Sequence, residues 1–89
     1  MNQQELNREI VAGFLSPYDA SDDWWESDDD AEGFPEPKDW AVIAARVVIN
    51  NLRDRRGIKD GFMRVDEETR VEIVNTMADL IREVHRRHT

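Results

Sequence analysis

Residues 38–55 read KDWAVIAARVVINNLRDR, and this stretch decides the fold. Its β-branched residues suit a strand as well as a helix, but the length of the run and Asp39 near its start favour a helix. Drawn as a helix, it is apolar around most of its circumference: Trp40, Val42, Ile43, Ala44, Ala45, Val47, Val48, Ile49 and Leu52. The polar residues form only a narrow stripe: Arg46, Asn50, Arg53 and Asp54. Such a helix must be covered by protein on two sides.

An amphipathic stretch precedes this central one. Residues 2–15 repeat apolar side chains at helical spacing and end at Ser16-Pro17, because proline disfavours helix in the residue before it. The apolar face consists of Leu6, Ile10, Val11, Phe14 and Leu15. We therefore expect a first helix over residues 2–15.

A third helix is predicted over residues 66–86. Asp66 is a good N-cap, and bases gather at the carboxyl end, where the helix dipole favours cations. Its main apolar stripe is Val71, Val74, Met77, Ala78, Ile81 and Val84. In the connection over residues 56–65, Gly57 suits the position after a helix end, and Ile58, Phe62 and Val65 are expected to tuck beneath it. The fold expected for residues 1–89 is a single all-α domain, a small three-helix bundle with a long acidic loop between helices one and two.

The charge of this chain is concentrated in one segment. The net charge is −8, yet residues 16–37 hold nine acids and no base, so the remaining residues carry 12 bases and 11 acids. The acids of the segment are Asp19, Asp22, Asp23, Glu26, Asp28, Asp29, Asp30, Glu32 and Glu36. Because nucleic-acid affinity comes mainly from Lys and Arg on phosphates, direct nucleic-acid binding is disfavoured, and a basic partner is favoured.

Several classes of function lack support in the sequence. The chain has no cysteine, no phosphate-binding glycine loop, no nucleophile elbow and no HExxH motif, so we expect neither an enzyme nor a cofactor. A calcium loop starting at Asp19 has Trp24 where glycine is needed, and His85 with His88 lacks a third ligand, so no metal is expected. Without a signal peptide or a spanning stretch, a cytoplasmic protein is expected.

Aromatic residues accompany the acids of residues 16–37. Two interpretations remain open. In one, the segment is an extended, solvated loop whose aromatics pack on the domain, with carboxylates folding back on Arg53, Arg55, Arg56, Lys59 and Arg64. In the other, it is a docking surface whose carboxylates imitate a phosphate backbone and whose aromatics act as anchors. The candidate partner-binding residues are Asp22, Asp23, Trp24, Trp25, Glu26, Asp28, Asp29, Asp30 and Phe34.

The second half of the chain resembles small uncharacterised proteins encoded by bacteriophages and prophages. The resemblance runs from Trp40 to the end and is carried by RRGIK at residues 55–59 and VDEETRVEIV at residues 65–74. It implies a virus-encoded accessory protein. Such proteins are often inhibitors of host defence, including anti-CRISPR and anti-restriction proteins, and acidic ones often act as DNA mimics.

Two hypotheses of function follow. The first is a non-enzymatic, phage-type inhibitor in the cytoplasm of a host bacterium. It would bind a basic host defence protein through the acidic segment and block the nucleic-acid-binding site of that protein. The alternative is a structural or assembly module that forms a homodimer through apolar surface on the helices over residues 38–55 and 66–86.

Overall fold

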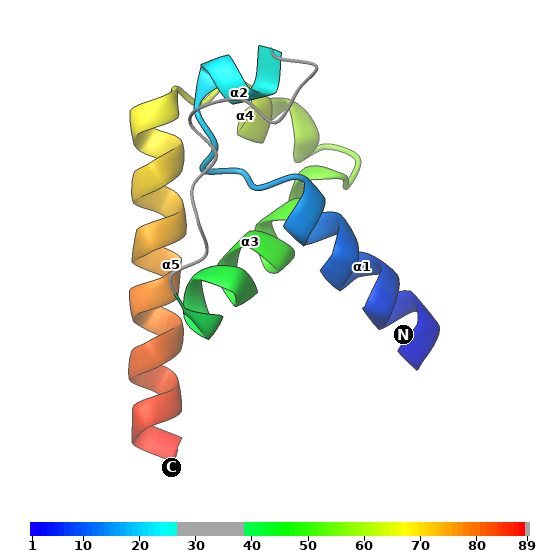
Figure 1. Cartoon of the computed structure of the whole chain (residues 1–89), viewed down its shortest axis with the longest axis vertical. Coiled ribbons are helices and arrows are strands. Elements are labelled where there is room, and N and C mark those ends of the chain that lie inside the picture. Colours follow the sequence, from blue (N-terminus) through cyan, green and yellow to red (C-terminus); the bar gives the residue numbers. More distant parts are fainter. Residues whose placement is uncertain (27–38, 89) are drawn as a thin grey trace.

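The residues that the computed structural model describes, 1–26 and 39–88, are mostly helical (Figure 1). The helices are α1 (Gln3–Leu15), α2 (Asp22–Glu26), α3 (Trp40–Arg53), α4 (Lys59–Met63) and α5 (Glu67–His88). No strand occurs in these ranges, which confirms the all-α class. None of the described helices combines the length and apolarity needed to cross a bilayer.

Side-chain caps fix the starts of the three long helices. Asn2 accepts a hydrogen bond from the Glu5 N–H, and Asp39 accepts one from the Val42 N–H at 3.0 Å. Asp66 likewise accepts from the Thr69 N–H at 2.8 Å, as expected for an N-cap before α5. Each cap satisfies an N–H that has no partner within its own helix, so the polar residues before each apolar stripe set where the helix begins.

Gly57 does not cap α3 as expected. The C-cap of α3 is Asp54, and Gly57 lies beyond it in the turn that leads to α4. Gly57 has a φ of 87° and is the one described residue with a left-handed backbone. Glycine is needed here because this conformation is strained for a residue with a side chain. The turn redirects the chain into α4, a helix that the sequence did not predict.

Helix α3 is the centre of the fold and packs against α1, α4 and α5, which confirms that it is covered on two sides. Figure 1 shows α1 and α5 diverging on the two sides of α3. The expected three-helix bundle, in which each long helix packs on both others, is therefore not the arrangement observed. The core consists of Tyr18, Ala41, Val42, Ala45, Ile49, Val74 and Ala78, with Phe62, Val65, Ile73, Met77 and Ile81 packed against it.

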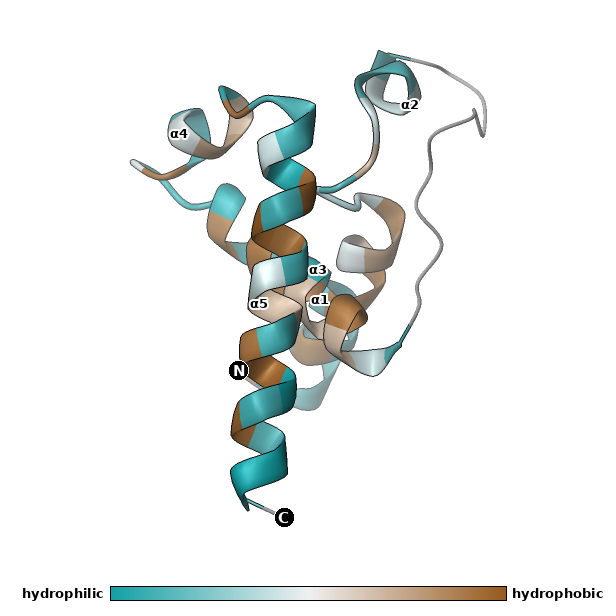
Figure 2. Ribbon diagram, turned by 90° about the vertical axis from the view of Figure 1, so that its left-hand side faces the viewer, coloured by the Kyte–Doolittle hydropathy of each residue, from teal (hydrophilic) through white to brown (hydrophobic). Residues whose placement is uncertain are grey.

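The buried core is small for the apolar content of the chain. Four of the eight buried apolar residues are alanine, whereas many large apolar side chains are at least a third exposed. Trp40, Val48 and Val84, expected to be buried, are each about half exposed. In Figure 2, brown and teal alternate along α5, and its last turn is hydrophilic. The fold thus leaves apolar surface open on several helices.

Gly13 allows α1 to approach α3 closely. A Cβ atom at this position would lie 2.7 Å from Val47 Cγ2 and 2.8 Å from Val47 Cα. The second distance is to backbone, which cannot rotate away as a flexible side chain can. The contact between α1 and α3 therefore depends on the missing side chain of Gly13.

We predict that Gly13→Ala lowers the free energy of unfolding by about 1–3 kcal/mol, because overpacking against Val47 outweighs the gain in helix propensity. Gly61→Ala in α4 is the matched control, since a Cβ there meets nothing within 4 Å. The control should raise the free energy of unfolding by about 0.5–1 kcal/mol. Urea denaturation followed by circular dichroism measures both; equal stabilisation by the two substitutions would contradict the close α1–α3 contact.

Candidate functional site

The acidic segment over residues 16–37 has four consecutive buried residues near its start, Pro17, Tyr18, Asp19 and Ala20. Tyr18 belongs to the same core cluster as residues of α3 and α5. The expectation of an extended, solvated chain is therefore wrong for residues 17–20. The expectation that part of the segment packs on the domain is correct for Tyr18. The rest of the candidate site is built on this buried stretch, residues 17–20.

Asp19 forms a buried ion pair with Arg46 of α3. Arg46 Nε lies 2.8 Å from Asp19 Oδ1, and Nη2 lies 3.0 Å from Oδ2. The side chains are only 6% and 8% exposed. This two-point geometry is the strong form of an arginine–carboxylate contact. Arg46, a member of the narrow polar stripe expected for this helix, is therefore buried, and Asp19 has both oxygens engaged rather than available to a calcium ion.

Arg70 of α5 holds the backbone of the same segment. Its Nε donates to the Tyr18 carbonyl at 3.1 Å, Nη2 donates to the Ala20 carbonyl at 3.2 Å, and Nη1 donates to the Val65 carbonyl at 2.8 Å. Nη2 also lies 2.6 Å from Asp22 Oδ1. One planar guanidinium thus satisfies three backbone carbonyls and one carboxylate, which a flexible ammonium cannot reproduce.

Tyr18 connects the buried stretch, residues 17–20, to α4. Its hydroxyl donates to the Phe62 carbonyl at 2.7 Å, and the two rings meet edge to face with centroids 5.5 Å apart. Burial raises the pKa of the Tyr18 phenol above its usual value of 10.0. The phenol therefore stays protonated at neutral pH and remains a hydrogen-bond donor.

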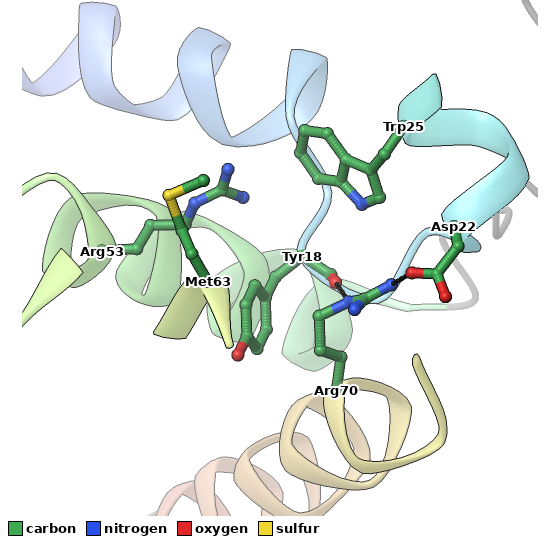
Figure 3. A pocket seen from close by; sticks show the side chains of 6 residues that line it. All are labelled: Tyr18, Asp22, Trp25, Arg53, Met63 and Arg70. Atoms are coloured by element: carbon green, nitrogen blue, oxygen red, sulfur yellow. Dashed lines mark hydrogen bonds and ion pairs between the residues drawn. The ribbon is translucent and has the colours of Figure 1, made fainter. Parts of the chain in front are cut away.

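A cleft of about 330 Å³ opens beside Tyr18 (Figure 3). The Arg53 guanidinium lies 4.7 Å from the centre of the Trp25 ring and 5.8 Å from that of Tyr18. These are cation–π distances. Burial lowers the pKa of Arg53, and its Nη1 is buried with no hydrogen-bond partner among the described residues. The lining residues are Tyr18, Asp22, Trp25, Arg53, Met63 and Arg70.

Helix α2 follows the buried stretch along the chain and contacts the start of α5. The Asp22 N–H donates to Glu67 Oε1 of α5 at 2.7 Å, and Ser21 Oγ accepts from the Trp24 N–H at 3.2 Å. Trp24 and Trp25 meet edge to face, with ring centroids 4.9 Å apart. These contacts fix the first turn of α2 against the start of α5, although five residues are too few for a stable helix alone.

The structure brings five of the nine candidate partner-binding residues together on α2. Asp23 and Glu26 are exposed, Trp25 is 37% exposed, and Trp24 is partly buried. Asp22 is 63% exposed but paired with Arg70. The other four lie outside the described residues: Asp28, Asp29, Asp30 and Phe34.

The carboxylates that fold back do not pair with the expected bases. Asp19 and Asp22 pair with Arg46 and Arg70, which lie within the long helices. Of the bases in the expected set, Arg53 contacts the segment through aromatic rings rather than a carboxylate. For Asp19 and Asp22 the expected pairing is therefore wrong in its choice of arginines, whereas the other carboxylates of the segment after Glu26 lie outside the described residues.

One of the two histidines considered as metal ligands, His85, packs against an aromatic ring. The His85 ring lies edge to face with Trp40, with centroids 5.0 Å apart. Within residues 1–26 and 39–88, no three His, Asp or Glu side chains are grouped to hold a metal ion.

Comparisons of the chain with protein-family models, curated protein sequences and solved structures found no match. The chemistry of the site is therefore the basis for any statement of function.

Arg46 and Arg70 were missed as site residues, although their positions carry a signal. Arg46 follows Val42 by four residues and precedes Ile49 by three, so it lies on the buried face of α3. Arg70 stands four residues before Val74 on the buried face of α5. An arginine in register with an apolar stripe indicates a buried partner, here the acidic segment.

We predict that Asp19→Asn lowers the free energy of unfolding by about 3–5 kcal/mol, because the buried Arg46 guanidinium loses the carboxylate charge that contacts it at two points. The double variant Asp19→Leu/Arg46→Met removes both charges and should recover most of this loss. Equilibrium unfolding in urea compares the two. A double variant no more stable than Asp19→Asn would argue against charge burial as the cause.

Arg70→Lys tests the role of the guanidinium. Lysine keeps the charge but loses the fork, so backbone carbonyls of the segment lose donors, and we expect a loss of about 2–4 kcal/mol. Arg64→Lys at an exposed site is the control and should change stability by less than about 0.5 kcal/mol. Tryptophan fluorescence during urea unfolding measures both variants; similar effects would contradict the role assigned to Arg70.

Proposed function

We propose that this chain is a non-enzymatic inhibitor that binds a basic, nucleic-acid-binding surface of another protein. The class of partner is a host defence protein of a bacterium, as the phage-type resemblance of residues 40–89 implies. The observation that carries the proposal is the anchored α2. Arg70 and Glu67 hold Asp22 at the start of this helix, while Asp23 and Glu26 remain exposed.

Charge gives the site its selectivity. Residues 22–36 contain eight acids and no base, and the exposed acids of α2 stand at the start of this run. Among the residues that the structure describes, Asp23 and Glu26 form no ion pair, so both are available to Lys or Arg of a partner. Such a concentration of one sign accelerates encounter with a surface of the opposite sign and disfavours acidic competitors.

Anchoring makes the acidic site more effective. A segment that must be ordered on binding loses conformational entropy, which weakens the complex. Residues 17–22 are already fixed by the Asp19–Arg46 pair and by the Arg70 hydrogen bonds. The conformational entropy of these residues is therefore lost when the protein folds and is not lost again when it binds a partner. The exposed part of the Trp25 indole supplies apolar contact area beside the acids, and tryptophan is a typical energetic centre of protein interfaces.

The test compares two variants with the same net charge. The site variant carries Asp23→Asn, Glu26→Gln, Asp28→Asn and Asp29→Asn; the control carries Glu5→Gln, Asp60→Asn, Glu68→Gln and Glu72→Gln. Each removes four acids and changes the net charge from −8 to −4. Proteins retained from a bacterial lysate by the native chain at low salt are identified, purified and titrated with the native chain and both variants.

We predict at least a tenfold weaker affinity and a shallower salt dependence for the site variant, with the control close to the native chain. Duplex DNA should compete with the native chain for the same partner, because both would occupy one basic surface. Unchanged binding by the site variant, or a partner that duplex DNA does not release, would overturn the proposal.

A further inference from the structure

Helix α1 exposes much of its apolar face although it packs on α3. Leu6, Ile10, Val11, Phe14 and Leu15 of α1 and Val48 of α3 are each between 41% and 69% exposed. Among the described helices, α1 packs closely only against α3, and Gly13 lies close to Val47 in this contact. A helix of 13 residues is marginal by itself, so its stability depends on burying this face.

A groove of about 200 Å³ follows the seam between α1 and α3. Its apolar lining includes Leu6 and Ile10 from α1 and Val47, Val48 and Leu52 from α3. The outward residues Val11 and Leu15 extend the apolar surface beyond this groove. The groove and the outer face of α1 therefore form one surface, which we call the α1 face.

The size of the α1 face fits a dimer. An aromatic side chain presents roughly 150–250 Å² and an aliphatic one somewhat less, so these six residues, which are about half exposed on average, amount to on the order of 400 Å². A standard interface takes about 800 Å² from each partner, of which somewhat more than half is apolar. One α1 face therefore supplies most of the apolar area that each copy contributes to a standard dimer.

Exposed apolar content favours the α1 face over a second apolar surface on the molecule. That second surface exposes three large apolar side chains, Trp40 of α3 and Leu80 and Val84 of α5, whereas the α1 face exposes six. Charge does not distinguish the two surfaces, because the arginines at the end of α5 are paired with carboxylates and α1 also carries both signs. A twofold interface uses the same surface of both copies, so the surface with more apolar side chains buries more apolar area.

We propose that two copies of this chain associate through their α1 faces into a homodimer with twofold symmetry. The apolar residues of α1 from one copy pack into the groove between α1 and α3 of the other. Each copy then buries the face that its own fold leaves open. This dimer is independent of the acidic site, because no residue of the α1 face belongs to α2 or to residues 16–37.

The test measures mass in solution with variants at two surfaces. Sedimentation equilibrium of the native chain from low to high micromolar concentration should approach twice the chain mass of 10.4 kDa. Val11→Lys/Leu15→Lys adds two charges to the α1 face and should weaken dimerisation at least tenfold. Leu80→Lys/Val84→Lys is the matched control on α5, at side chains that are similarly exposed, and should leave the dimer intact.

Circular dichroism and thermal unfolding verify that each variant keeps its helices, and the single variant Leu15→Lys repeats the test at the most exposed position of α1. A native chain that is monomeric at high micromolar concentration overturns the proposal. The proposal is also overturned if Leu80→Lys/Val84→Lys disrupts the dimer and Val11→Lys/Leu15→Lys preserves it. That result would place the interface on α3 and α5. Because the α1 face is apolar, added salt should leave the dimer intact, whereas salt should weaken the partner binding proposed for the acidic site.

Discussion

The buried ion pair between Asp19 and Arg46 is the constraint on which the rest of the structure depends. A charged guanidinium on the buried face of α3 requires an equally buried anion, and Asp19 meets this requirement with both oxygens. The chain after α1 must therefore return into the space between α3 and α5. Tyr18 and Ala20 are buried with it, and Arg70 satisfies their carbonyls. One charge in the core thus fixes the course of the segment after α1.

This course explains why the fold is not a three-helix bundle. In such a bundle, α1 would fill the space beside both α3 and α5. Here Tyr18 contributes to the core cluster of those two helices, so residues 17–20 occupy part of that space. Helix α1 is left to pack on α3 at another side, where Gly13 allows close approach to Val47. The apolar residues that a bundle would bury on α1 consequently remain exposed.

Sequence periodicity predicted the long helices because each has an apolar stripe and a polar cap, as at Asp39 and Asp66. It could not predict α2 or α4, since five residues are too few to show a helical period and both depend on tertiary contacts such as the Glu67 contact to Asp22. The charge count located the acidic segment but did not distinguish the buried Asp19 from the exposed acids that follow it. Periodicity places side chains on a face and does not show that an arginine on that face requires a buried carboxylate.

The same constraint gives the molecule two surfaces of different chemistry. Residues 17–20 are drawn into the core, so the acidic chain leaves it at a fixed point beside Arg70, and α2 carries the first exposed acids there. Because α1 packs on another side of α3, the apolar residues of α1 form a second exposed surface. Salt screens attraction between charges but does not weaken the burial of apolar area. The two proposed interactions, with a basic partner and with a second copy of the chain, therefore differ in their expected response to ionic strength, and they use separate residues.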